Sequence, residues 1–237
     1  SIFRSMVVDN ILWLRELDKN KINIAGTKAA YLADMCSKGF QVQNGFVISV
    51  DAFNEFLHSN SLDAEIKKIL KDLSMENQEE ISRASEKIKR IIINEKISSV
   101  LESDILEAYD NLNVDEELLR VSGNVLSLIK RGRSNAIVAV RSSAVSDIPG
   151  SCSNFLNIIG SKSLINSIKE CWSSIYSAGN ILIMKKNNQD NSLAVIVQKM
   201  VDVSKSGVIL SSNPMNREKE IIVEANFGLG QLVTRGE

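Results

Sequence analysis

Glycine and proline are distributed unevenly in this sequence, and this limits where the chain can turn sharply. Only three of the 12 glycines precede residue 123, and both prolines, Pro149 and Pro214, lie beyond it. Glycine adopts backbone angles that other residues avoid, and proline interrupts helices and strands. We therefore expect tight turns and close approach to ligands at residues 26–45 and from 132 onward, with plain helix between them.

The segment from 61 to about 130 has the spacing of amphipathic helices. Apolar residues recur there at intervals of three and four, with acidic residues and lysines between them, as in the set Ile66, Ile69, Leu70 and Leu73. This periodicity gathers the apolar side chains on one face of each helix. We interpret the segment as four helices with a structural role.

The rest of the chain mixes helices with short apolar strands. Before residue 61, the pattern predicts an extended segment at 6–17, a helix at 28–38 with Thr27 as its N-cap, a strand at 45–49 and a helix capped by Asp51. Later runs predict strands at 137–143, 155–160, 193–201, 207–214 and 220–225, with a long helix at 161–186. This order predicts an α+β fold with an antiparallel sheet.

Composition argues against several classes of protein. The 237 residues include 28 Lys and Arg against 29 Asp and Glu, a net charge of −1, which gives no electrostatic reason to expect nucleic acid or an acidic membrane as a partner. No run approaches the ~18–20 apolar residues of a membrane span. The three cysteines form no CxxC pair, which favours reduced thiols. We expect a soluble, cytoplasmic protein that binds neither nucleic acid nor a membrane.

Two cations are candidates for binding an anion. Arg141 ends an apolar strand and precedes two serines and a loop, so its guanidinium could bind phosphate oxygens in a fork while loop groups close over them. Lys28 follows Gly26 at a helix start, where its ammonium and exposed helix N–H groups would both attract a phosphate. Taken singly, the two residues are better explained as an arginine paired with a nearby acid and an ordinary surface lysine. The lone His58 offers no basis for a catalytic triad or a metal site.

Three ordered segments together resemble the ATP-binding domain of phosphoenolpyruvate synthase and pyruvate phosphate dikinase. Residues 24–57 are similar to its opening, in which a Gly-Lys-Ala-Asn-Leu segment leads to a Gly-Phe-x-Ile strand. Residues 139–160 resemble its Arg-Ser-Ser-Ala strand, phosphate-covering loop and Phe-Leu-Asn strand. Residues 194–237 resemble its Val-Gln-x-Met-Val hinge, Ser-Gly-Val strand, Asn-Pro turn and Gly-Leu-Gly-Glu loop.

The resemblance implies an ATP-grasp type fold with two α+β lobes and a mostly helical insertion. The first lobe would comprise residues 1–50 and 135–190, the insertion 51–134, and the second lobe 191–237, which would be truncated before the family's last metal and phosphate residues. Family members split ATP to AMP and pass the β-phosphate to a histidine on a separate swivelling domain, from which it reaches an acceptor such as pyruvate. The resemblance therefore implies a phosphotransferase whose partners are a phosphohistidine domain and a phosphoryl-acceptor domain, in cis or in trans.

The resemblance also assigns site residues. Lys28 and Arg141 would hold the ATP phosphates as catalytic and binding residues, with Ser142 beside them and the loop 147–154, turning at Gly150, folded over the β- and γ-phosphates. The hinge bordering adenine would be formed by Gln198, Lys199, Met200 and Val201, and the implied cofactor Mg²⁺ would be bound by Gln231 and Glu224.

A second interpretation stays open. The family has a glutamate where this sequence has Gln231, and an amide oxygen is a weaker, uncharged ligand for Mg²⁺. Further phosphate and metal residues of the family follow beyond position 237, so we expect a fragment or one subunit of a split enzyme that lacks full activity by itself. The alternative is a degenerate or regulatory nucleotide-binding module without turnover.

Overall fold

A computed structural model describes residues 10–71, 73–112, 135–145, 153–187, 192–230 and 233. The chain divides into two compact units, Ser1–Met200 and Val201–Glu237, and each is considered by itself. We expected a second lobe to begin at 191. Residues 193–199 form a strand inside the sheet of the first unit.

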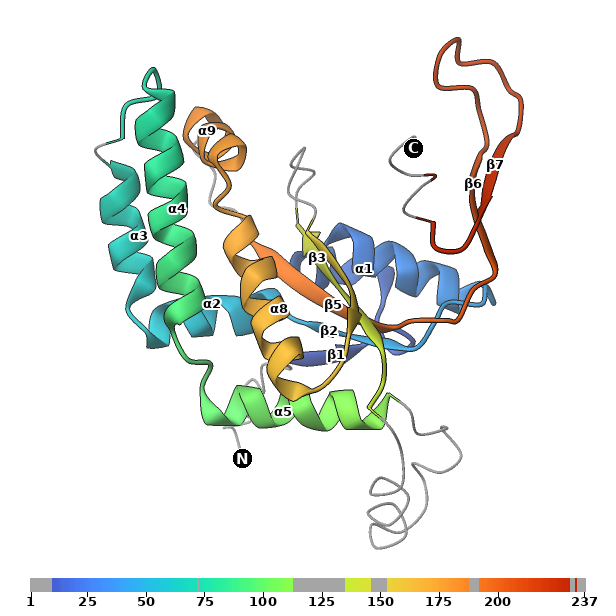
Figure 1. The fold of residues 1–237 in the computed structure, drawn as a ribbon, viewed down its shortest axis with the longest axis horizontal. Coiled ribbons are helices and arrows are strands. Elements are labelled where there is room, and N and C mark those ends of the chain that lie inside the picture. Colours follow the sequence, from blue (N-terminus) through green and yellow to red (C-terminus); the bar gives the residue numbers. More distant parts are fainter. Residues whose placement is uncertain are drawn as a thin grey trace, which may run out of the picture. The chain divides into compact units, whose positions relative to one another are not determined.

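The first unit is organised around a five-stranded antiparallel sheet (Figure 1). Its strand order is β1 (Ile11–Trp13), β2 (Gly45–Ile48), β5 (Leu193–Lys199), β3 (Val138–Ala144) and β4 (Asn154–Ile158). The central strand β5 pairs with β2 on one side and β3 on the other, which is why it belongs to this sheet. The predicted α+β class with antiparallel strands is confirmed.

Side chains that alternate along the strands form two separate cores. On one face, Val140 and Val197 join a large cluster with Trp172, whose ring stacks on Phe53 and Phe56 at centroid distances of 5.6 and 4.9 Å. On the opposite face, Val47, Ala194 and Ile196 pack against the alanines of one helix. Successive strand residues point to opposite faces, so each strand serves both cores.

Helix α1 (Ile22–Ser37) covers the second face. Ala25, Ala29 and Ala33 recur every fourth residue and are buried against the sheet, which lets the helix approach closely because the side chains are small. Gly26 interrupts the helix with φ 76° and ψ 165°. The helix was expected at 28–38. One further turn therefore precedes the kink, and a 3-10 turn at Lys19–Lys21 leads into it.

Helices α2 to α5 follow as a largely helical stretch and pack on the first face of the sheet. They are α2 (Val50–Ser59), α3 (Leu62–Lys71), α4 (Gln78–Asn94) and α5 (Ser99–Asn111). The hydroxyl of Ser49 accepts the N–H of Ala52 at 3.2 Å, so Ser49 caps α2 in place of the expected Asp51. Three of the four helices expected between 61 and 130 are observed, and the fourth, expected near 115–129, lies outside the described residues.

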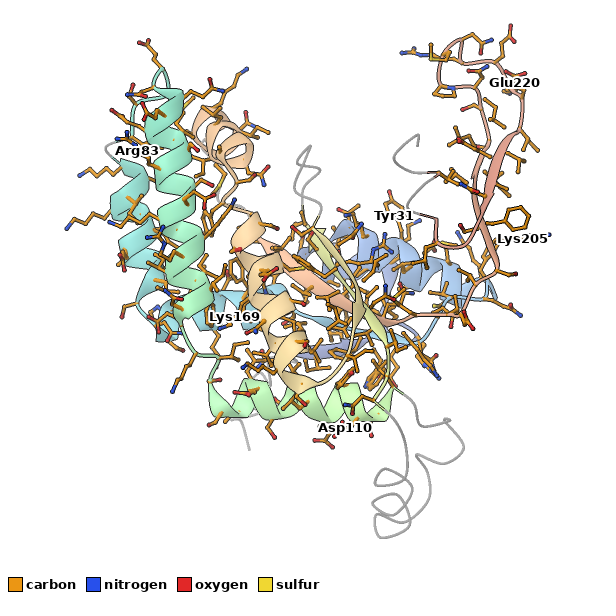
Figure 2. The ribbon with its side chains drawn as sticks, in the orientation of Figure 1. Tyr31, Arg83, Asp110, Lys169, Lys205 and Glu220 are labelled. Atoms are coloured by element: carbon orange, nitrogen blue, oxygen red, sulfur yellow. The ribbon has the colours of Figure 1, made fainter. Side chains whose placement is uncertain are left out.

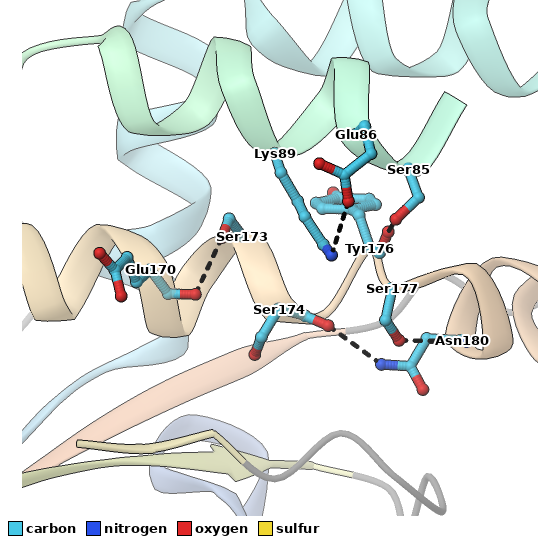
Figure 3. A network of polar contacts seen from close by, with 9 residues as sticks. All are labelled: Ser85, Glu86, Lys89, Glu170, Ser173, Ser174, Tyr176, Ser177 and Asn180. Atoms are coloured by element: carbon cyan, nitrogen blue, oxygen red, sulfur yellow. Dashed lines mark hydrogen bonds and ion pairs between the residues drawn. The ribbon is translucent and has the colours of Figure 1, made fainter. Parts of the chain in front are cut away.

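The helix expected at 161–186 is divided into α8 (Ser161–Ser174) and α9 (Ala178–Asn187). A network of hydrogen bonds holds the corner between them against α4 (Figure 3). Ser85 donates its hydroxyl to the carbonyl of Tyr176 at 2.7 Å, and the buried side-chain amide of Asn180 donates to the carbonyl of Ser174 at 3.2 Å. These contacts satisfy carbonyl groups that a broken helix leaves without partners.

Two lysines connect the sheet-covering helices to the ends of α3 and α4. Lys169 of α8 donates to the carbonyl oxygens of Ile93 and Glu95, at 2.6 and 3.2 Å, at the C-terminal end of α4 (Figure 2). Lys185 of α9 donates to the carbonyl of Leu73, just beyond α3. A positive charge at a helix C-terminus satisfies carbonyl groups and is favoured by the helix dipole.

The second unit is a hairpin of β6 (Lys205–Leu210) and β7 (Ile222–Phe227). Gly207 allows the strands to approach, because a Cβ atom there would lie 2.5 Å from the carbonyl oxygen of Glu224. One face carries Ile209, Val223 and Phe227, each more than 60% exposed. None of the described helices in either unit is both long and apolar enough to cross a membrane.

Candidate functional site

The start of α1 is joined to the end of β3 by a set of short contacts. Ala29 donates its N–H to the hydroxyl of Ser143 at 3.1 Å, and Thr27 donates its hydroxyl to the carbonyl of Val145 at 3.2 Å. A Cβ atom on Gly26 would lie only 2.1 Å from the carbonyl oxygen of Ser143. Glycine is therefore required at position 26 by both its positive φ and its contact with the strand.

These contacts fix the backbone of Lys28 beside β3. Lys28 immediately precedes Ala29, which is fully buried and already donates its N–H to Ser143. The sequence predicted that exposed N–H groups at this helix start would help to attract an anion. The amide of Ala29 cannot do so in this structure, because Ser143 already accepts it, and the Lys28 residue beside it is partly exposed.

Arg141 lies on the same side of the sheet as α1. It pairs across the sheet with Ile196, which belongs to the core formed with α1, and directly opposite residues in antiparallel strands share a face. Gln198 lies on this face too, opposite Ala139. The structure thus brings together, on one face, the backbone of Lys28 and the side chains of Arg141 and Gln198.

Ser142 lies on the opposite face and is 1% exposed. Its hydroxyl accepts the N–H of Ser153 at 3.0 Å, and its own N–H donates to the carbonyl of Ser153 at 3.1 Å. In this structure Ser142 anchors the chain where it returns to the sheet after the expected phosphate-covering loop. Gly150 of that loop lies outside the described residues.

Several hydrogen-bonding groups of the expected adenine hinge, residues 198–201, already bind neighbouring segments of the first unit. The N–H of Lys199 donates to the carbonyl of Asn44 at 2.8 Å, the N–H of Met200 donates to Ile137 at 2.9 Å, and the Gln198 side-chain amide donates to Gln43 at 3.2 Å. The main-chain N–H groups of Lys199 and Met200 are therefore already used within the first unit. Val201 is 44% exposed and is the first residue of the second unit.

Sequence reasoning did not single out Ser143 as a site residue, and it expected Asn154 only as the last residue of the phosphate-covering loop. Ser143 is fully buried and holds the start of α1, and Asn154 accepts a hydrogen bond from Nε of Arg141 through its side-chain oxygen at 3.3 Å. A buried serine in an Arg-Ser-Ser run and an asparagine at a strand start were visible in the sequence. The local sequence does not show that Ser143 binds Ala29, 114 positions away, or that Asn154 binds Arg141, 13 positions away.

Cys171 and His58 have surroundings that do not favour chemistry. Burial raises the pKa of the Cys171 thiol to about 12, with Glu170 adding to the rise and Lys28 acting against it. A thiol with so high a pKa is almost entirely protonated at neutral pH and is a poor nucleophile. His58 lies on the surface with its Nδ1 3.7 Å from a carboxylate oxygen of Asp63.

The expected metal ligands are only partly described. Glu224 is exposed on β7 opposite Val208, and Gln231 lies outside the described residues. Among the residues that the structure describes, no three His, Cys, Asp or Glu side chains are grouped so that they could hold a metal ion. A magnesium ion bound with a nucleotide needs only one or two protein carboxylates, because phosphates and water supply its other ligands. A single glutamate is compatible with such a site.

Comparison with known proteins places this arrangement in a family. The AMP/ATP-binding domain of pyruvate phosphate dikinase matches residues 22–237. A probable phosphoenolpyruvate synthase of Methanothermobacter thermautotrophicus is 31% identical over 97% of this chain and 33% of its own length. A probable phosphoenolpyruvate synthase of Archaeoglobus fulgidus is 33% identical over 95% of this chain and 29% of its own length. The phosphoenolpyruvate synthase of Aeropyrum pernix is 31% identical over 96% of this chain and 27% of its own length.

This chain therefore spans about a third or less of the length of these relatives. The family resemblance drawn from the three sequence segments is confirmed, because the match includes all but the first 21 residues. The chain belongs to the family of pyruvate phosphate dikinase AMP/ATP-binding domains.

Proposed function

We propose that this chain binds ATP together with Mg²⁺ and splits it, so that phosphate passes to a histidine on another domain. It would be the ATP-binding part of a phosphotransferase of the phosphoenolpyruvate synthase type. The histidine domain and the domain that carries the final phosphoryl acceptor would act in cis or in trans. The length of the relatives supports this proposal, since most of each relative lies outside the region matched here.

The observation that carries the proposal is the pairing of two cations on one face of the sheet. Arg141 lies on the α1 side, and the contacts among Gly26, Ala29 and Ser143 hold the backbone of Lys28 at the end of the same strand. A planar guanidinium binds two phosphate oxygens at once, and an ammonium adds a mobile point charge. Arg141 on the sheet and Lys28 at the start of the helix packed against it would therefore bind and orient a polyphosphate.

In the proposed reaction, these residues act by position and charge. Phosphoryl transfer places little covalent chemistry on the protein, and its rate depends mainly on alignment of the phosphates and on neutralisation of their charge. We propose Lys28 and Arg141 for both tasks, Gln198 to Val201 for the adenine base, and Ser142 and Gly150 for holding the loop. Bound Mg²⁺ would supply further neutralisation, with Glu224 and Gln231 as its proposed protein ligands.

A second function is favoured by one residue. Gln231 provides an amide where the family's Gly-Leu-Gly-Glu loop provides a carboxylate, and the loss of this charge weakens a magnesium site. The alternative is a nucleotide-binding module that regulates or contacts a partner without turnover. The Gln231→Glu variant separates the two functions, because it should restore a dependence on Mg²⁺ if position 231 faces the metal.

Binding is tested first by calorimetry and thermal unfolding with Mg·ATP. The unsubstituted chain should gain about 2.7 kcal/mol in its free energy of unfolding at a ligand concentration of about 100 times Kd. Arg141→Ala should weaken binding by at least about tenfold, since it removes a charged, forked contact. The matched control is Arg83→Ala, which removes an exposed arginine on α4 that pairs with Glu79 and should leave binding unchanged. If Mg·ATP produces no heat and no stabilisation, the chain does not bind ATP and the proposal is wrong.

Turnover is tested separately by adding the histidine domain of a phosphoenolpyruvate synthase. AMP and phosphohistidine should both appear when this domain and Mg·ATP are present, and neither should appear with Arg141→Ala. Binding of ATP without either product would contradict the phosphotransferase and leave the module without turnover as the function.

A further inference from the structure

Arg141 has a neighbour whose contact with it the proposed nucleotide site does not use. Asn154 is the first residue of β4 and pairs directly with Arg141 across the sheet, so the two side chains lie on the same face. The side-chain oxygen of Asn154 accepts the Nε–H of Arg141 at 3.3 Å. We propose that Asn154 is a positioning residue that orients the guanidinium of Arg141 toward the phosphates of the nucleotide. This inference rests on the proposed function.

The choice of guanidinium nitrogen is what gives the contact a directional effect. A guanidinium can bind phosphate or carboxylate as a fork along two edges, one formed by its two terminal nitrogens and one formed by Nε with the adjacent terminal nitrogen. Asn154 occupies the Nε position of the second edge. A partner at Nε restrains rotation of the whole plane while leaving the edge of the two terminal nitrogens to a ligand. A partner at the terminal nitrogens would instead compete with the ligand.

The position of Asn154 is itself fixed by its neighbours. Ser153, the preceding residue, is bonded to Ser142 in both directions, through Ser142 N–H to the Ser153 carbonyl and through Ser153 N–H to the Ser142 hydroxyl. Ser142 is almost fully buried and follows Arg141 directly. Two consecutive residues of β3 therefore hold the start of β4. Ser142 binds Ser153 on one face of the sheet, and Arg141 binds Asn154 on the other.

Fixing an arginine before it binds lowers the cost of binding. Arginine has several rotatable bonds and loses rotamer freedom when it grips a ligand, and this loss is smaller when another contact has already restricted the side chain. The contribution of Asn154 should therefore appear in ligand affinity rather than in the stability of the fold. The contact is exposed, so its loss should change the melting temperature very little.

A double-mutant cycle in the full chain tests the role of Asn154. The variants are Asn154→Ala, Arg141→Lys and their combination, and the probes are Mg·ATP and inorganic tripolyphosphate measured by calorimetry. Lysine keeps the positive charge but has a methylene at the position of Nε, so it cannot make the contact that Asn154 makes with arginine. Asn154→Ala should weaken binding of both probes by about fivefold in the otherwise unsubstituted chain and by less than about twofold when Arg141→Lys is already present.

Three results would overturn this proposal in distinguishable ways. An equal loss in both backgrounds would show that Asn154 contacts the ligand itself and does not act through Arg141. No loss in either background would show that the contact is unimportant for binding. Failure of the unsubstituted chain to bind either probe would instead contradict the proposed function, and this inference with it. Far-ultraviolet circular dichroism and melting temperature of each variant establish that it is folded.

Discussion

The two faces of the five-stranded sheet are built differently, although the same strands supply both. One face packs against several helices through large side chains, including the buried ring of Trp172 between α8 and α2. The other face is covered by the alanines of α1, and beyond them it presents Arg141, Asn154 and Gln198. We call these the core face and the site face.

This difference separates stability from binding within single strands. In β3, Val138 and Val140 point to the core face and are fully buried, while Arg141 and Ser143 point to the site face. Because strand residues alternate, the chain can change the two properties independently. Substitutions on the core face should alter the free energy of unfolding, and those on the site face should alter affinity for Mg·ATP as well.

The largest expected effect is on the core face. Trp172→Ala removes the ring that stacks on Phe53 and Phe56 and should lower the free energy of unfolding by about 3–5 kcal/mol. Urea denaturation measures this loss. The affinity of the folded fraction for Mg·ATP should stay unchanged, since the ring lies on the side away from Arg141.

Trp172→Phe provides the milder comparison. Nε1 of Trp172 is buried and has no hydrogen-bond partner among the described residues, so phenylalanine removes ring volume without leaving an acceptor unpaired. It should cost clearly less than alanine. A fall in ATP affinity that follows the loss of stability in both variants would contradict the separation of the two faces.

Gly26→Ala should come next and should affect both properties. The new Cβ atom would overlap the Ser143 carbonyl, and alanine tolerates φ 76° and ψ 165° poorly, so the free energy of unfolding should fall by at least about 2 kcal/mol. Affinity for Mg·ATP should fall with it, because Lys28 moves away from β3. Gly39→Ala is the matched control, since Gly39 also has positive φ but a Cβ atom added there would meet no described atom within 4 Å. It should destabilise less and leave affinity unchanged.

The elements of the fold could be predicted from the sequence where a local pattern determines them. The apolar run before Arg141 predicted β3 to within a residue, and the spacing of apolar residues after 61 predicted α3 and the helices that follow it. Local pattern could not predict the break between α8 and α9, because it depends on contacts from Ser85 and on the buried Asn180. Nor could it place β5 in the centre of the sheet, since pairing with β2 and β3 is a long-range choice.

The candidate site shows the same limit. Arg141 and Lys28 could be selected for their charge and their positions at element ends, and family resemblance connected them. Their placement on one face could not be derived, because it depends on the contact between Ala29 and Ser143. Ser142 was favoured over Ser143 as a site residue, yet strand alternation directs Ser142 to the core face. A sequence pattern shows that alternate residues of β3 point to opposite faces of the sheet. It does not show which of these two groups of residues faces α1.

A pair of buried serines sharpens the comparison between the faces. Ser143→Ala leaves the N–H of Ala29 without its acceptor on the site face, and Ser85→Ala removes the donor to Tyr176 on the core face. Each should lower the free energy of unfolding by about 1–3 kcal/mol. Only Ser143→Ala should also weaken Mg·ATP binding, because only Ser143 holds the helix start that carries Lys28. Equal binding losses in the two variants, measured by calorimetry, would show that affinity merely follows stability.

The smallest effect should come from Lys169, which connects α8 to the end of α4 at the margin of the core face. Lys169→Met keeps most of the apolar stem but removes the donors to the Ile93 and Glu95 carbonyls, so the free energy of unfolding should fall by about 1 kcal/mol. Lys162→Met, on the exposed first turn of the same helix, should change it by less than about 0.5 kcal/mol. Hydrogen exchange should show the loss of protection concentrated in the last turn of α4, because those carbonyl groups lose their partner while the rest of the helix remains packed. An unchanged exchange rate there would mean that the last turn of α4 is held by its apolar contacts without help from Lys169.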